Sequence, residues 1–386
     1  MSDIIASIQR LAASLYELPA TGRRLNGLEG FRAYAAFLIF LVHYCDSYAT
    51  RILAVDPNSL RLSTVPDVWT GVIFYFFASH YGVDLFFFLS GFLICRMLLR
   101  PDFDYRRFLM GRIARIYPAF ALSLVVWACM RIAVQQWYSL DLAQVAGNLL
   151  FLNAVPAFGV KAYNTVTWSL FFEFVFYLTF PVIVCGARPS DRVTPARIAV
   201  FAAIFMPLVL QVGTLFIRFL MFFGGALLAV LPPERIRRLA TCITDGPAVA
   251  LYLLSTVLFA KWLNYTLFIP IFVATTALVA VKVIHGQGIL ARWFGWTPFR
   301  YFGNISYSFY LMHGLGIEIT MNFYGQEFLQ LGSLPYLITT FAASLAIGVI
   351  SATVLFVAAE RPYFTWRAGA IPCPPRAIGI DRAAAK

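Results

Sequence analysis

The chain has 386 residues, of which 61% are hydrophobic and 12% are charged. Because soluble domains carry about 25% charged residues, this composition excludes an ordinary soluble protein and indicates a polytopic membrane protein. The formal net charge is +12, and it follows the membrane topology described below, so we expect no nucleic-acid partner.

The first 24 residues are expected to form a separate N-terminal segment. They lack the uninterrupted apolar stretch of a cleavable signal peptide, and they end in Arg23 and Arg24. Apolar residues recur at helical spacing in IIASIQRLAASLYEL (4–18). This pattern predicts an amphipathic helix on the cytoplasmic surface of the membrane.

Ten segments are apolar and long enough, at roughly 20 residues each, to be predicted as membrane spans. They lie at about 31–48, 71–98, 115–135, 166–186, 196–212, 214–231, 246–262, 265–284, 303–323 and 334–357. The second segment is so long that a start nearer His80 is an alternative. The fifth and sixth form one apolar run, which we divide at Gly213. An apolar stretch at 148–158 is too short to cross, and a re-entrant loop is the alternative there.

The distribution of arginine sets the orientation of these spans. If the N-terminus is cytoplasmic, the basic connections all lie inside, as the positive-inside rule requires. The connection at 96–115 is the most basic. We therefore predict an all-α, polytopic membrane protein with about ten transmembrane helices and both termini cytoplasmic. Residues 25–362 form the transmembrane domain, and 363–386 form a disordered tail rich in proline and alanine.

Neither a disulfide framework nor a metal site is predicted. The six cysteines show no CxxC spacing, and most lie in or beside apolar segments, where a free thiol behaves as a small apolar group. No internal repeat of fixed period is visible. This weakens the case for a transporter built from repeats.

Ionisable residues inside the predicted spans are the first candidates for a functional site, because such groups are costly in lipid. His43 lies past the midplane of the first span, and a helical rise of about 1.5 Å per residue places Glu173 at a similar depth. His80 and Asp84 descend from the outer side, and His313 reaches the middle of the membrane. Each of these side chains alone could be a buried packing or ion-pair group. Their shared depth favours a common polar cavity.

A second group of candidates lies at the cytoplasmic edge. Arg112 and Arg115 are three residues apart and share one helix face. Guanidinium groups bind phosphate in bidentate fashion, although anionic lipid headgroups and topology explain the same spacing. Arg32 precedes His43 by eleven positions, about 16 Å along a helix, so the two are not expected to touch.

Six motifs occur in the order typical of a known family. FRAYAAFLIFLVH (31–43) has a basic residue, Arg32, and ten intervening positions before His43. The others are GVDLFFFLSGFLI (82–94), FLMGRIARIYP (108–118), WSLFFEFVFY (168–177), FGNISYSFYLMHG (302–314) and ERP (360–362). From Leu25 to Pro362 the chain resembles the acyltransferase 3 family of integral membrane O-acyltransferases. The motifs add further site candidates, namely Trp168, Ser306, Tyr307 and Tyr310.

The resemblance implies an enzyme of the bacterial inner membrane. Such an enzyme moves an acyl group, usually acetyl, from cytoplasmic acyl-coenzyme A to a hydroxyl of a carbohydrate or glycolipid. Acetyl-coenzyme A is then a co-substrate, and no permanently bound cofactor is expected. The acceptor is left open among surface polysaccharide, lipopolysaccharide, nodulation factor, peptidoglycan and macrolide. The acyl chain length and the oligomeric state, with a homodimer among the options, are also open.

In this scheme His43 is the general base or a transient acyl carrier, and Glu173 or Asp84 fixes its tautomer. Arg112 and Arg115 hold the coenzyme A phosphates, and Arg32 contacts the pantetheine or phosphate part of the donor.

Ser306, Tyr307 and Tyr310 are candidate donors to the thioester carbonyl or to the acceptor, although helix packing explains them equally well. Buried histidine and carboxylate groups also make proton relays. A transporter or flippase of a polar envelope lipid or glycan is therefore the rival hypothesis.

Overall fold

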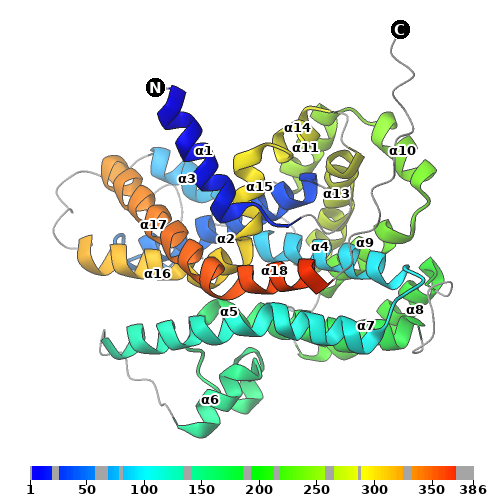
Figure 1. Ribbon diagram of the computed structural model, residues 1–386, viewed down its shortest axis with the longest axis horizontal. Helices are drawn as coiled ribbons and strands as arrows, with labels where there is room; N and C mark the ends of the chain where they lie inside the picture. The colour runs from blue at the N-terminus through cyan, green and yellow to red at the C-terminus, as the bar shows by residue number, and fades with distance from the viewer. Residues whose placement is uncertain are drawn as a thin grey trace.

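The computed structural model describes residues 2–19, 26–56, 68–77, 81–133, 141–185, 193–212, 218–256, 265–285, 288–324 and 333–370. All regular elements within these residues are helical, which confirms the predicted all-α fold (Figure 1). The amphipathic N-terminal segment forms α1 (Ser2–Tyr16). Its last residue, Tyr16, hydrogen-bonds Thr353 across 3.0 Å, which ties the segment to the rest of the bundle.

Each predicted span overlaps at least one helix. These helices are α2 (Asn26–Arg51), α3 (Val68–Phe77) with α4 (Tyr81–Leu98), α5 (Tyr105–Ala133), α7 (Trp168–Cys185), α8 (Pro195–Val212), α9 (Phe219–Val230), α11 (Asp245–Leu254), α13 (Tyr265–His285), α16 (Ser306–Tyr324) and α17 (Ser333–Leu355). Shorter helices connect them, namely α6 (Leu142–Leu149), α10 (Pro233–Cys242), α14 (Ile289–Phe294), α15 (Thr297–Asn304) and α18 (Arg361–Ala370).

Six helices in the described part of the chain are long and apolar enough to cross a membrane. They are Gly27–Arg51, Tyr81–Leu98, Tyr105–Ala133, Thr165–Cys185, Leu267–Ile284 and Leu334–Arg367. A seventh is counted if α9 and α10 form one broken span, in which the helix axis bends by 108° at the break. The protein is therefore a multi-pass helical membrane protein. The number of ten spans and the placement of both termini stay predictions.

Helix α5 begins well before the span predicted at 115–135. The carboxylate of Asp104 accepts a hydrogen bond from the backbone N–H of Arg107 at 2.6 Å, which caps the first turn. Arg112 and Arg115 therefore lie within this continuous helix, in agreement with their predicted place on one helix face. Hydropathy missed this start because arginine is a good helix former but raises the polarity of the segment.

The last span also continues further than predicted. A π-helical turn, Phe356–Glu360, joins α17 to α18. Residues 363–370, which the sequence assigned to the disordered tail, are therefore helical. The rest of that tail, 371–386, lies outside the described residues.

Residues 148–158 form the end of α6 and two single 3₁₀ turns, Leu152–Ala154 and Pro156–Phe158. Figure 1 shows α6 on the far side of α5 from α16 and α17. Asn148 accepts from the N–H of Tyr163 at 2.9 Å and donates to the carbonyl of Lys161, which folds the segment back on itself. Whether it enters the membrane as a re-entrant loop stays a prediction.

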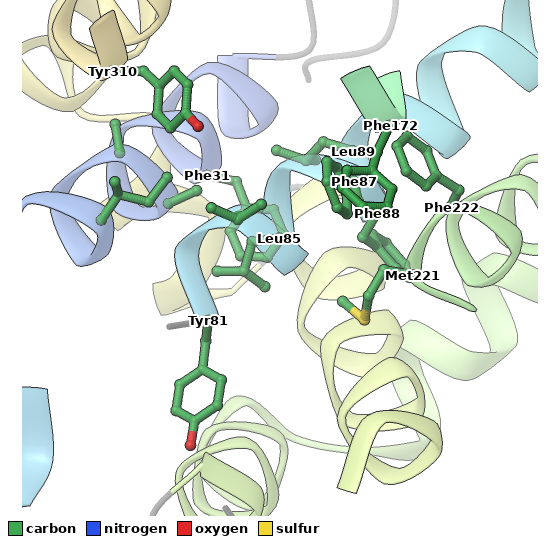
Figure 2. Close-up of a cluster of buried hydrophobic side chains, with 14 of the residues drawn as sticks. Phe31, Tyr81, Leu85, Phe87, Phe88, Leu89, Phe172, Met221, Phe222 and Tyr310 are labelled. Carbon is green, nitrogen blue, oxygen red and sulfur yellow. The ribbon is translucent and has the colours of Figure 1, made fainter. Parts of the chain in front are cut away.

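The helices pack through aromatic side chains and closely approaching backbones. Phe87 of α4 stacks on Phe222 of α9 at a centroid distance of 4.5 Å (Figure 2). Phe222 also stacks on Phe176 of α7 at 4.4 Å. At the same crossing, a Cβ on Gly225 would collide with the backbone carbonyl of Phe88. Small residues at such crossings let membrane helices approach until their backbones are in contact.

We therefore expect Gly225→Ala to lower the free energy of unfolding by about 1–3 kcal/mol, because the added methyl group has to push α4 and α9 apart. Thermal unfolding in detergent measures this effect. Gly246→Ala is the matched control, since no atom lies within 4 Å of its added Cβ. Equal melting temperatures for the two variants would contradict the close crossing.

Candidate functional site

A cavity of about 90 Å³ lies between α2, α4, α5, α7 and α16. Most of its wall is apolar, with Phe86, Phe87 and Leu93 among the lining residues. Residues singled out from the sequence supply much of the polar lining, namely Arg32, Arg112, Arg115, Glu173, Tyr307 and Tyr310. Helices far apart in sequence thus bring one candidate group together around one space.

Two of the three arginines of this cavity lie over aromatic rings. The guanidinium of Arg112 lies 5.4 Å from the ring centres of Phe108 and Tyr177, and that of Arg115 lies 5.4 Å from the ring centre of Phe364. Arg112 also contacts the sulfur of Met97 at 3.0 Å. Such contacts stabilise a cation without neutralising it.

Among the described residues, none of the three cavity arginines has a carboxylate oxygen within 4.0 Å. The acidic side chain that lines the cavity beside them is Glu173. Its carboxylate accepts a hydrogen bond from Ser90 of α4 at 2.5 Å. The cavity therefore carries an excess of positive charge inside an apolar wall, where an anion is strongly attracted.

The cavity tyrosines are anchored by hydrogen bonds. Tyr307 donates to the carbonyl of Ile116 at 3.0 Å. Tyr310 donates to the carbonyl of Val166, and its hydroxyl lies 2.6 Å from the hydroxyl of Ser169. These bonds fix the rings between α5, α7 and α16, so both tyrosines have a packing role whatever else they do.

Glu360 is a buried carboxylate next to this cavity that the sequence analysis did not select. It has no exposed surface, and it accepts hydrogen bonds from the backbone N–H and the hydroxyl of Ser308. Its charge acts on Arg32 and Arg115. The ERP motif contained a signal for it, but the π-helical turn that turns Glu360 inward cannot be predicted from hydropathy.

The two histidines predicted in the first and ninth spans lie beside each other. The ring centroids of His43 and His313 are 5.3 Å apart, at an interplanar angle of 31°. Tyr310, one turn before His313 on α16, lies at a centroid distance of 6.2 Å from it, and this tyrosine lines the cavity. The histidine pair and the arginine cavity are thus neighbours that share Tyr310, although His43 is not among the cavity-lining residues.

Asp84 and Trp168 belong to a different buried cluster. A carboxylate oxygen of Asp84 lies 3.0 Å from a guanidinium nitrogen of Arg218, and both side chains are almost fully buried. The guanidinium of Arg218 lies 5.6 Å from the ring centre of Trp168. Asp84 is therefore paired with an arginine. The sequence hypothesis had offered it as a carboxylate partner of His43.

Two sequence candidates remain, Ser306 and His80. Ser306 is fully buried, and its hydroxyl has no hydrogen-bond partner in the described part of the chain. His80 lies outside the described residues.

A further charged cluster lies on the same two helices as the histidines, one to two turns beyond them. Glu318 of α16 pairs with Arg51 of α2 at 2.7 Å and with Arg131 of α5 at 3.8 Å. Nothing in the sequence predicted these ion pairs. They tie α2, α5 and α16 together, and so they hold the two histidine-bearing helices in register.

The sequence model of the acyltransferase 3 family, described as an acyltransferase domain, matches residues 25–353. The chain belongs to this family. Two curated relatives are similar to it. One is YrhL of Bacillus subtilis (strain 168), provisionally named a peptidoglycan O-acetyltransferase, which is 24% identical over 343 residues, covering 78% of this chain and 49% of the relative.

The other relative is the acyltransferase MdmB of Streptomyces mycarofaciens, which is 27% identical over 176 residues, covering 43% of this chain and 40% of the relative. The chain thus spans at most about half the length of these acyltransferase 3 relatives. No solved structure matches. Family membership and the names of the relatives support a membrane O-acyltransferase.

Proposed function

We propose that the protein moves an acyl group, in the simplest case acetyl, from acyl-coenzyme A to a hydroxyl of a carbohydrate. The donor would bind from the cytoplasm, and the acceptor would be a cell-envelope or exported glycan at the bacterial inner membrane. The observation that carries this proposal is the cavity with three arginines directly beside the pair His43 and His313. Family membership supports the same reaction class.

The arginine cavity would receive the reactive end of the donor. A water molecule occupies about 30 Å³ in the liquid, so a cavity of about 90 Å³ is large enough for an acetyl group. The nucleotide of coenzyme A has to stay outside the cavity, so its phosphates would lie at the cavity entrance. Arg112 and Arg115 would attract the donor phosphates from the cavity side of α5, and Arg32 would contact the pantetheine or phosphate part.

His43 would act as the general base. Its imidazole takes the proton of the acceptor hydroxyl while the hydroxyl oxygen attacks the thioester carbonyl carbon. The carbonyl oxygen then carries negative charge, and a nearby cation or hydroxyl would stabilise it. Tyr310 and Tyr307 could donate to it only by releasing their hydrogen bonds to the carbonyls of Val166 and Ile116. When the intermediate collapses, the carbon–sulfur bond breaks, and the imidazolium returns the proton to the leaving thiolate.

A transporter or flippase with a proton relay is the second function that buried histidines would support. Membranes that contain the protein, incubated with radiolabelled acetyl-coenzyme A and the envelope glycans of the host, separate the two. We expect label to enter the glycan fraction. Transbilayer movement of glycan without incorporation of label would favour the transporter.

Arg115→Ala should raise the apparent KM for acetyl-coenzyme A by about tenfold or more, because a charge-assisted hydrogen bond to phosphate contributes about 1.5–3 kcal/mol. Steady-state kinetics in detergent measure this change. Arg106→Ala is the matched control, since Arg106 is exposed near the start of the same helix. An equal KM for the two variants would make Arg115 a residue of topology and packing alone.

A further inference from the structure

His313 is a buried imidazole with only one of its two nitrogens satisfied. The side chain has no exposed surface, and its Nδ1 lies 3.1 Å from the carbonyl oxygen of Phe309. A carbonyl oxygen only accepts hydrogen bonds, so Nδ1 carries the proton and Nε2 carries a lone pair. Nε2 is buried, and no donor reaches it within the described residues.

Packing alone does not explain a histidine at this position. A buried acceptor without a donor destabilises a protein by about 1–3 kcal/mol, and an apolar side chain of similar volume would avoid that cost. Unsatisfied buried groups of this kind are typical of sites where a partner arrives during function. The question is which donor can reach Nε2.

His43 is the adjacent imidazole, on α2, with its ring centroid 5.3 Å from that of His313. At this separation, a small rotation about the side-chain torsions brings ring nitrogens within hydrogen-bond distance. His43 is partly exposed, whereas His313 is fully buried. The ring of His43 can therefore meet a substrate, while that of His313 is enclosed by other side chains, His43 among them.

We propose that His313 is the positioning residue of His43. When one ring nitrogen of His43 takes the proton of the acceptor hydroxyl, the N–H on its other nitrogen donates to Nε2 of His313. His313 keeps its own proton on Nδ1 throughout, held by the carbonyl of Phe309. It thus takes the place that a carboxylate has in a serine–histidine–aspartate triad. This inference rests on the proposed function, because it requires His43 to be the base.

Two substitutions of His313 separate positioning from packing. His313→Met fills the space without an acceptor, and His313→Gln places an amide oxygen near the position of Nε2. We expect kcat to fall on the order of 100-fold in the methionine variant, with an unchanged KM for acetyl-coenzyme A, and to recover at least in part in the glutamine variant. Thr320→Val is the control, because it removes another buried polar atom without a partner from α16, and it should leave kcat unchanged.

Nuclear magnetic resonance of protein labelled with ¹⁵N-histidine tests the pairing without any turnover. The chain has four histidines, so the ring signals are few enough to assign by substitution. We expect His313→Gln to shift the ring ¹⁵N signals of His43, and Thr320→Val to leave them in place. Unchanged His43 signals, or a methionine variant with the wild-type kcat, would overturn the proposal. Absence of acyl transfer by the wild type would instead refute the proposed function. The resonance experiment would still show whether His43 and His313 are hydrogen-bonded.

Discussion

His43→Ala should abolish acyl transfer and leave the protein folded. Loss of a general base typically slows a reaction by about 10²–10⁴-fold, and the imidazole next to His43, that of His313, has no exposed surface with which to replace it. Incorporation of radiolabelled acetyl groups into glycan measures the loss. Thermal unfolding in detergent measures whether the fold survives.

Tyr44→Phe is the matched control for His43→Ala. Tyr44 is the next residue of α2, fully buried, and its hydroxyl donates to the carbonyl of Leu337 at 2.6 Å. Loss of that bond should lower stability by about 1 kcal/mol with little effect on transfer per folded molecule. The two neighbours are thus expected to show opposite effects. Retained transfer in His43→Ala would remove His43 from the mechanism.

A second experiment on His43 separates a general base from a covalent acyl carrier. If His43 carries the acyl group transiently, donor alone should leave an acylated His43 that acid quenching and peptide mass spectrometry detect. If it is a base, no acylated His43 forms, with or without the acceptor.

The sequence predicted the helices well because hydropathy and helix length are local properties. Every predicted span overlaps at least one helix, although six of these helices are long and apolar enough to cross a membrane in the described part of the chain. Errors arose where a helix continues past its apolar part, as at the start of α5 and beyond α17. In both places the deciding interaction is a polar one, the cap by Asp104 and the bonds from Ser308 to Glu360, and hydropathy does not register it.

The candidate site was harder to predict, because it depends on which residues meet. Family motifs selected the cavity arginines and both histidines, yet nothing in the sequence pairs His43 with His313, which lie on helices near opposite ends of the chain. The sequence hypothesis paired His43 with a carboxylate at similar depth. Depth along the membrane is predictable from helical rise, but the rotation of each helix about its axis is not. That rotation directs Glu173 to Ser90 and Asp84 to Arg218.

Asp84→Ala should destabilise the protein by about 3–5 kcal/mol, because it leaves the charge of Arg218 buried without its partner. The side chain of Arg218 is 9% exposed and that of Asp84 is 0% exposed. Denaturant unfolding in detergent measures the effect. Glu17→Ala, which breaks a contact of Arg300 with a side chain that is 46% exposed, is the control and should cost at most about 1 kcal/mol.

The double variant Asp84→Ala with Arg218→Met then decides what Asp84 does. It removes both charges, and methionine can fill the space of the arginine stem beside Trp168, so most of the lost stability should return. If the ion pair only joins α4 to the start of α9, this variant transfers acyl groups at nearly the wild-type rate. A variant that is stable but inactive would show that the carboxylate of Asp84 takes part in the reaction, as its position in the second-span motif first indicated. The two outcomes differ in activity at equal stability, so misfolding cannot be mistaken for loss of a catalytic group.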